Sequence, residues 1–315
     1  MTETGPGIAA PFDRGAVRTH RNRAAGQFAR HDFLFRETGA RLVERLGDIR
    51  HEFPVVLDLG CHLGGLGEGL LARAGTEQVV QCDLSPAMAR GARAANGIPT
   101  VAADEEALPF APGTFDLIVS NLSLHWVNDL PGALVQIRSS LKPDGLFLAC
   151  LLGGATLTAL RAAWMDAELA IEDGASPRVS PFADVRDGGD LLARAGFALP
   201  VADLDTIEAA FTDPLALMAA LRHMGEANAV RERRKAFTRR QTLLEAARRY
   251  ALAQAGEAGG EADEVRAGFD VIWLAGWAPG PDQPKPLRPG SAQSRLADAL
   301  KTTEHPTGVK PGEDD

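Results

Sequence analysis

No stretch of the sequence is long and apolar enough to cross a membrane. The longest strongly apolar run is LFLACLL, residues 146–152, whereas a spanning helix needs about 20 such residues. The first residues, MTETGPGIAAPFDRG, lack the charged start and apolar centre of a secretory signal. The arginine-rich segment 14–36 contains Asp32 and is flanked by Asp13 and Glu37, whereas a transit peptide is poor in acids. We therefore expect a cytoplasmic protein without a transmembrane segment, while peripheral association with a membrane stays open.

Cysteine and lysine are both scarce. Cys61, Cys82 and Cys150 lie in or beside apolar runs and form no CxxC pair, so we expect reduced core thiols and neither a zinc site nor a disulfide framework. Nearly all basic residues are arginine, which together with abundant alanine and glycine indicates a bacterial source with a GC-rich genome. The net charge of −9 argues against a general nucleic-acid binder.

What is present suits an α/β protein. A chain of 315 residues, 45% of them apolar, forms one large domain or two small ones. Apolar strand-like segments alternate with helix-like segments, which is typical of βαβ units and of a parallel sheet covered on both faces. We expect strands at 53–60, 78–85, 114–124 and 141–152, and helices at 64–75, 86–97 and 129–141.

The pattern changes after residue 153. We expect a helix at 156–172, an irregular loop with two prolines, a helix at 187–196, a return to the sheet at 197–207, helix over 213–254 and a late strand at 269–277. The resulting divisions are N-terminal cap helices at 1–50, a cofactor-binding core at 51–210, a helical insert at 211–262, the last strand at 263–280 and a disordered tail at 281–315.

The stretch VVLDLGCHLGGLGEGLL, residues 55–71, has the form of a nucleotide-binding turn. A strand that ends in Asp58-x-Gly60 is followed by Gly64 at the start of the expected helix. Glycine at position 60 allows a sharp turn and a close approach of a ligand to the backbone. The helix N-terminus offers unpaired N–H groups to a carboxylate or a phosphate. The turn, with Cys61, is therefore a predicted cofactor site.

Acidic residues follow at the ends of the next strands. Asp83 comes 19 residues after Gly64 (83 − 64), close to the interval of about 20 for an acid that binds ribose hydroxyls, and Leu84 stands beside it. Asp104 and Glu105 follow a short apolar run, where Asp104 could accept a hydrogen bond from the adenine amine. Three acids line this site and the loop has no lysine, so a polyphosphate ligand is disfavoured. A ligand that carries adenosine without phosphates is favoured, such as S-adenosylmethionine.

His62 stands where such loops usually carry glycine. At a negative φ any L-residue is sterically admissible, and glycine would then be a preference rather than a need. One interpretation gives His62 a polar contact with the cofactor or substrate. The other, which we favour, is a tolerated substitution.

Four side chains follow the strand at 115–120 and are expected at the carboxyl edge of the sheet, where ligands of such folds bind. They are Asn121, Ser123, His125 and Trp126. His125 is the candidate base or substrate contact, and Trp126 could enclose the cofactor. Equally, Trp126 could be a core aromatic residue and His125 a hydrogen-bonded cap.

Several motifs resemble class I S-adenosylmethionine-dependent methyltransferases. They are VLDLGCHLGGL, QCDLSPAM, ADEEALPF, FDLIVSNLSLHWVNDLPGAL and LKPDGLF. SLHWVNDLP is similar to two branches, the malonyl-carrier-protein O-methyltransferase of biotin synthesis and the mitochondrial complex I assembly factor 5 family with its bacterial relatives. FDRGAVRTHRNRAA, GGATLTALR, SPRVSPFADVRDGGDLLARAGF, MGEANAVRERRK, FDVIWLAGW and RPGSA favour the second branch, over roughly residues 11–295.

The resemblance implies a doubly wound, mostly parallel seven-stranded sheet of the Rossmann-like methyltransferase type, with cap helices before it and a helical insert before the last strand. It also implies S-adenosylmethionine as cofactor and a protein substrate. Methyl transfer follows from the fold, whereas the complex I branch implies arginine hydroxylation on an iron–sulfur subunit of complex I. The alternatives are the malonyl-carrier-protein O-methyltransferase and a non-catalytic assembly chaperone that keeps the cofactor.

Hydroxylation most often uses iron held by two histidines and a carboxylate. None of the seven histidines is followed by the His-x-Asp or His-x-Glu pattern, so no metal site is expected, and His20, His31 and Asp32 are candidates by residue type only. In the N-terminal segment we expect Phe12, Phe28 and Phe33 to face inward. Two interpretations are open for the basic residues of this segment, Arg14, Arg21 and Arg23, and for the basic run 231–240. They face an acidic surface of a partner, or they are exposed to solvent, which is the commoner outcome.

Overall fold

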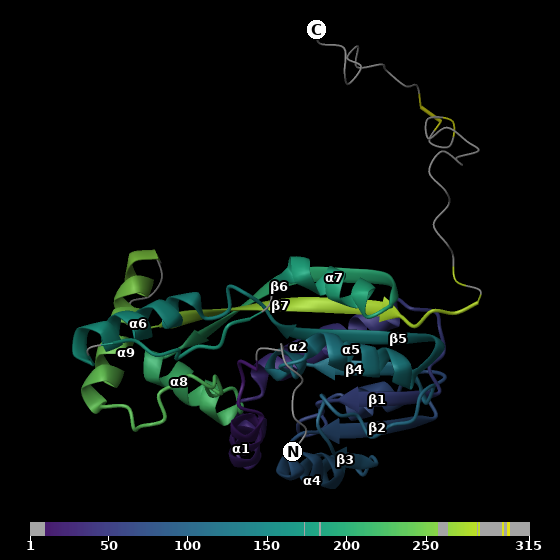
Figure 1. Cartoon of the computed structure of the whole chain (residues 1–315), viewed down its shortest axis with the longest axis horizontal. Coiled ribbons are helices and arrows are strands. Elements are labelled where there is room, and N and C mark those ends of the chain that lie inside the picture. The colour runs from purple at the N-terminus through teal and green to yellow at the C-terminus, as the bar shows by residue number, and fades with distance from the viewer. Residues whose placement is uncertain are drawn as a thin grey trace. The chain divides into compact units, whose positions relative to one another are not determined.

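Seven strands form one sheet in the order β3-β2-β1-β4-β5-β7-β6 (Figure 1). The computed structural model describes residues 10–172, 174–182, 184–257 and 264–281, together with Gln283, Asp298, Lys301 and Thr302. The strands are β1 (Val55–Leu59), β2 (Gln78–Asp83), β3 (Thr100–Ala102), β4 (Phe115–Asn121), β5 (Leu141–Leu152), β6 (Ala198–Phe211) and β7 (Val265–Trp277). All pairings from β3 to β5 are parallel, and β7 runs antiparallel to both β5 and β6.

The central strands read as continuous apolar runs because both of their faces are covered. Val56, Leu57 and Leu59 of β1 are fully buried, and so are Leu117, Ile118 and Val119 of β4. Alternate residues of these strands enter two separate apolar clusters, one on each face of the sheet. This arrangement is what a parallel sheet with helices on both sides requires.

The helices begin at clear capping signals. Asp13, Ser85, Asp129 and Asp213 each cap a helix, accepting hydrogen bonds from backbone N–H groups of its first turn, which stabilises a helix start. The helices are α1 (Arg14–Ala24), α2 (Phe33–Gly47), α3 (Gly67–Leu71), α4 (Pro86–Asn96), α5 (Leu130–Ser140), α6 (Thr158–Ile171), α7 (Val185–Arg194), α8 (Pro214–His223) and α9 (Arg240–Glu257). Two short 3-10 helices add to them, η1 (Phe28–Arg30) and η2 (Leu124–Trp126).

Helices gather at the carboxyl edge of the parallel strands. Figure 1 shows α6, α8 and α9 grouped at one end of the sheet, with α1 close to α8. In the chain, α8 and α9 lie between the end of β6 and the start of β7. Because β7 begins at this edge of the sheet, the insert is placed there too. The sheet and these helices belong to the compact unit that ends at Gly280.

Two expected helices differ from the observed ones. The helix expected at 64–75 is reduced to α3, since residues 62–66 form turns. The continuous helix expected over 213–254 is wrong, because the chain leaves helix between α8 and α9. Gly225 has φ +85°, and the bridge between Phe12 and Val230 holds the next residues extended. The basic run expected on a helix therefore lies almost wholly in this connection.

The expected disordered tail at 281–315 falls almost entirely outside the described residues. Among the residues that are described, no helix is long and apolar enough to cross a membrane.

Candidate functional site

The loop after β1 has three residues with a left-handed φ before α3, namely Gly60, His62 and Gly64. Gly60 has φ +74°, and a Cβ atom there would meet Ser123 at 2.2 Å, so only glycine fits this position. His62 has φ +49°, and the expectation that a negative φ admits any residue there is therefore wrong. The backbone N–H of His62 donates to Asp83 Oδ2 at 3.0 Å. That bond ties the loop to the end of β2.

A cavity of about 620 Å³ lies beside this loop. Asp58, Gly60, Cys61 and His62 form one wall, α2 forms another, and Asn121 closes the cavity at the end of β4. Asp58 Oδ1 and both ring nitrogens of His62 are buried without a hydrogen-bond partner among the described residues. Unpaired buried polar atoms at a cavity wall are the feature expected of a site that accepts a polar ligand.

Burial shifts the titration of both groups. It raises the pKa of Asp58 to about 7, opposed by the hydrogen bond from Gln81. It lowers the pKa of His62 to about 3, and the nearby positive charge of Arg21 acts in the same direction. His62 is therefore neutral at physiological pH, packed between the rings of Phe28 and Phe35 at centroid distances of 5.3 and 4.5 Å.

The acids expected to hold adenosine do meet at the next two strand ends, but two arginines of α1 cover them. Arg21 is fully buried and lies 3.2 Å from Glu105 Oε1 and 3.7 Å from Asp83 Oδ2. Arg14 pairs with Asp104 and Glu105. Arg14 and Arg21 therefore pair with acids inside the protein, and the expectation that they face a partner or the solvent is wrong. Arg23 is exposed, in agreement with the expectation of a solvated residue.

Charge balance explains how this cluster stays buried. Burial raises the pKa of Asp83 to about 6 despite the adjacent Arg21. Burial also opposes ionisation of Glu105, but the charges of Arg14 and Arg21 and the hydrogen bond from Ser123 lower its pKa to about 2. Ser123 Oγ donates to Glu105 Oε1 at 2.6 Å and accepts from Arg21 at 3.0 Å. Ser123 therefore belongs to this ionic cluster.

Asn121 is engaged elsewhere. Its side-chain oxygen accepts from Thr38 at 2.7 Å, and its amide donates to the carbonyl of Phe35 at 2.9 Å. Both partners belong to α2. Leu84 packs in a small apolar cluster with Phe12 and Trp126, and Gly64 has φ +79° at the turn that leads into α3.

His125 and Trp126 converge on a residue that the sequence analysis did not single out. Glu226 Oε2 lies 2.9 Å from His125 Nε2 and accepts from Trp126 Nε1 at 2.8 Å. Glu226 follows α8, 100 residues beyond Trp126, so only the tertiary fold brings them together. Trp126 is also a buried aromatic residue of the cluster with Phe12 and Leu84, as one of the two interpretations expected, and in addition both Trp126 and His125 contact a buried carboxylate.

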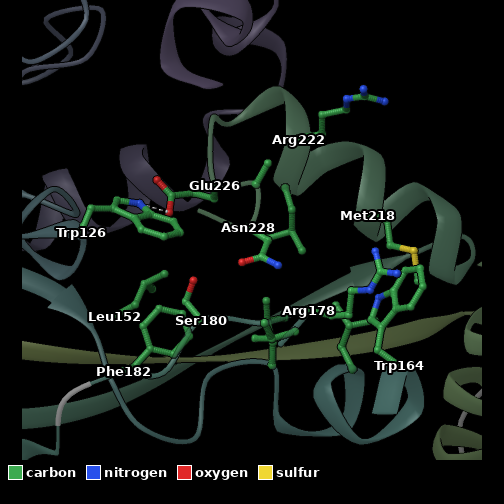
Figure 2. A pocket seen from close by; sticks show the side chains of 15 residues that line it. Trp126, Leu152, Trp164, Arg178, Ser180, Phe182, Met218, Arg222, Glu226 and Asn228 are labelled. Carbon is green, nitrogen blue, oxygen red and sulfur yellow. Dashed lines mark hydrogen bonds between the residues drawn. The ribbon is translucent and has the colours of Figure 1, made fainter. Parts of the chain in front are cut away.

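Glu226 and Trp126 line a second cavity of about 150 Å³ (Figure 2). Its other walls come from β5, α6, α8 and the segments 178–182 and 226–228. Asn121, in the wall of the larger cavity, and Trp126, in the wall of this one, are five positions apart on the same segment after β4 (126 − 121). The segment after β4 therefore contributes one residue to the wall of each cavity.

The N-terminal candidates for a metal do not form a site. His20 Nδ1 lies 3.1 Å from the carbonyl of Ala227, and the ring of His31 stacks on His223 at 4.6 Å. In the described part of the chain, no three His, Cys, Asp or Glu side chains group closely enough to hold a metal ion. Of the phenylalanines expected inside, Phe12 and Phe28 are buried and Phe33 is partly buried.

Comparison with known proteins gives matches to a domain family, to solved structures and to sequence relatives. Residues 57–149 match a methyltransferase domain family. A protein assigned as a methyltransferase from Bacillus halodurans has a similar structure, with a TM-score of 0.52 at 15% identity over 77% of this chain and 99% of that one. At this identity the likeness shows the fold alone, and it agrees with the expected Rossmann-like sheet.

Sequence relatives match over most of the chain. The mitochondrial arginine hydroxylase NDUFAF5 of Homo sapiens is 41% identical over 297 residues, covering 92% of this chain and 83% of the relative. The corresponding protein of Danio rerio is 39% identical over 294 residues, covering 92% and 89%. A malonyl-[acyl-carrier protein] O-methyltransferase of a Methylovorus species is 34% identical over 278 residues, covering 85% and 90%.

Proposed function

The chain belongs to the family of the mitochondrial arginine hydroxylase NDUFAF5, and on that premise we propose that it binds S-adenosylmethionine and modifies an arginine side chain of a protein. The observation that carries the proposal is the pair of cavities to whose walls the segment after β4 contributes, through Asn121 in one and Trp126 in the other. One suits the cofactor and the other a substrate side chain.

The residues of the larger cavity fit the methionine end of S-adenosylmethionine. The free Oδ1 of Asp58 can accept from the ammonium group, and the left-handed turn at Gly60 brings backbone close to a ligand. The adenosine end is expected at Asp83, Leu84, Asp104 and Glu105. These residues fit the chemistry of ribose and adenine, but Arg14 and Arg21 pair with the acids, so adenosine must displace those contacts.

When bound, S-adenosylmethionine supplies a methyl group that its sulfonium activates. The chain's own residues need only align the substrate and exclude water. Trp126 lines the smaller cavity, and Glu226 positions both Trp126 and His125 through its Oε2. Asn121 fixes α2 against the end of β4 and so sets the wall of the larger cavity.

We propose a complex I iron–sulfur subunit as the protein substrate and the cytoplasm as the compartment. Hydroxylation would add one oxygen atom to the arginine and requires an oxidant, whereas methylation would add one methyl group. The similarity to a malonyl-carrier-protein O-methyltransferase, at 34% identity, keeps that activity as the second candidate. A cofactor-binding assembly chaperone without catalysis is the third.

Deletion of the gene in the source organism separates these functions. Arginine-containing peptides of the complex I subunits are compared by mass spectrometry between the parent strain, the deletion strain and a strain restored with the unaltered gene. Loss of an added oxygen atom supports hydroxylation, and loss of an added methyl group supports methylation. Unchanged peptides with failed complex I assembly favour the chaperone, and a requirement for biotin favours the malonyl substrate.

A further inference from the structure

The smaller cavity has the dimensions of a single side chain. Its volume of about 150 Å³ is below the roughly 300–1,000 Å³ of sites that enclose a whole small molecule. Figure 2 shows Trp126 and Glu226 at one end and Trp164 with Arg178 at the other. Phe182 and Ser180 lie at the same end as Trp126, across from its ring. The cavity therefore suits one extended side chain that enters along an aromatic wall.

Glu226 is an ionised carboxylate with unused hydrogen-bonding capacity. Its side chain is 6% exposed, and Oε1 has no partner in the described part of the chain. Burial opposes ionisation, but the charge and hydrogen bond of His125, with the charge of Arg21 beyond, keep the pKa of Glu226 below its ordinary value. A buried carboxylate that is satisfied on one oxygen only gains most from a cationic donor.

The cationic side chains of the cavity are already committed or turned away. Arg178 Nε donates to Glu168 at 2.6 Å, Arg178 Nη1 donates to Thr238 at 2.9 Å, and its guanidinium stacks on Trp164 at 4.9 Å. Arg222 is exposed, and in Figure 2 its guanidinium points away from the other labelled side chains. The uncommitted charge of this cavity is therefore negative, which disfavours a carboxylate ligand such as a malonyl group.

We propose that Glu226 recognises the guanidinium group of the substrate arginine, with Trp126 and Phe182 as the walls along which the side chain lies. The inference rests on the proposed function and names its substrate subsite. A guanidinium is planar and donates in a fork that matches a carboxylate, and an aromatic face adds a cation–π contact. His125 and Trp126 act as positioning residues, because they hold Glu226 through Oε2.

Binding of small arginine probes tests this directly. The indole N–H of Trp126 donates to Glu226, so its NMR resonance reports on the subsite, and Trp126→Phe identifies that resonance among the four tryptophans. The intact chain is titrated at constant pH with Nα-acetylarginine methylamide and with the uncharged citrulline counterpart. We expect the arginine probe to shift the resonance at about tenfold lower concentration than the citrulline probe.

Glu226→Gln should abolish that preference, since it keeps an oxygen acceptor for Trp126 but removes the charge. The matched control is Glu208→Gln, an exposed acid on β6 that is 65% exposed in its side chain, and it should keep the tenfold preference. Thermal unfolding of each variant verifies folding. The comparison of the two probes on the unaltered chain needs no variant at all.

Three results would overturn the inference: equal response to both probes, a preserved arginine preference in Glu226→Gln, or a response to malonyl-N-acetylcysteamine in place of arginine. The proposed function fails separately. If the arginine probe binds selectively but deletion of the gene changes no arginine peptide, the subsite stands and the reaction does not. If an arginine modification depends on the gene while Glu226→Gln keeps its preference for the arginine probe, the proposed function stands and the role of Glu226 does not.

Discussion

His62 occupies a backbone conformation that favours glycine, yet its ring fills space between Phe28 and Phe35. Two effects of opposite sign therefore meet at one residue. A left-handed φ costs an L-residue about 1 kcal/mol or more, while each aromatic contact contributes about 0.5–1.5 kcal/mol. The packing of the histidine ring therefore offsets the strain of its backbone.

Replacement of His62 by two small residues separates these effects. His62→Gly relieves the strain and loses the ring contacts, so we expect a free energy of unfolding within about 1 kcal/mol of the original chain. His62→Ala loses the contacts and keeps the strain, and should be less stable than His62→Gly by about 1 kcal/mol. Urea unfolding measures both. An alanine variant as stable as the glycine variant would contradict the role given to φ.

The buried Asp58 gives the stability of the fold a pH dependence. Its pKa rises from an ordinary 3.8 to about 7 in the folded chain, so between these values the folded state holds a proton that the unfolded chain has released. Stability contributed by this group is complete below pH about 4 and is lost as the pH rises through 7. Asp83 shifts in the same direction.

Asp58→Asn removes this titration and leaves that of Asp83 in place. Relative to the original chain, the variant should gain about 2–3 kcal/mol in free energy of unfolding between pH 5 and pH 8. Denaturant unfolding at the two pH values provides the measurement, with Glu208→Gln as the exposed control. A difference in free energy of unfolding between the variant and the original chain that is equal at pH 5 and pH 8 would refute the raised pKa of Asp58.

Residue spacing predicts the turn and the acids but not their partners. Asp58, Gly60 and Asp83 follow from strand ends and a fixed interval along the chain, which are local features. Arg21 and Glu226 carry no such signal, because their contacts with Asp83 and Trp126 join segments far apart in the sequence. The left-handed φ of His62 was missed for the related reason that side-chain packing, not residue type, stabilises it.

At the scale of elements, α1 and the segment after α8 form one cover over the carboxyl edge of the sheet. The backbone N–H of Asp13 donates to the carbonyl of Ala229 at 2.8 Å, and Arg233 pairs with Asp13 at 3.0 Å. Arg14 and Arg21, which pair with the acids proposed to bind adenosine, lie on α1. Glu226, which we propose to bind the substrate, lies in the segment after α8, so both belong to neighbouring parts of the same cover.

Cofactor binding should loosen α1, since the acids that we propose for adenosine are the ones that pair with the α1 arginines. Hydrogen exchange of the intact chain, with and without S-adenosylhomocysteine, tests this. We expect faster exchange of the amides of α1 and slower exchange in residues 60–66, with α5 unchanged as an internal reference. Slower exchange in both α1 and the loop would mean that α1 closes over the cofactor without giving up its ion pairs.

At the scale of the whole molecule, β7 joins the parallel strands to β6. Leu274 pairs with Ala149 of β5 on one side and Ala202 of β6 on the other, and it is 2% exposed. The sheet is therefore one mechanical unit although β7 comes last in the chain. Sequence alone predicts β7 as a strand, but its place between β5 and β6 depends on long-range pairing that no local pattern encodes.

Leu274→Ala should destabilise the whole sheet. Removal of a buried leucine side chain costs about 2–5 kcal/mol, and we expect circular dichroism and tryptophan fluorescence to show one shifted transition. Leu204→Ala on β6, 45% exposed, is the matched control and should cost less than about 1 kcal/mol. Separate transitions for the two probes would show that β6 and β7 unfold independently of β1–β5.

The late position of β7 also bears on biosynthesis. A ribosome releases β1 to β6 before it releases the strand that pairs β5 with β6, so the nascent chain presents one unpaired edge of β5 and both edges of β6. Such edges are prone to associate with other chains. Assembly of this protein in the cell is therefore expected to benefit from chaperones that shield β5 and β6 until synthesis passes Trp277.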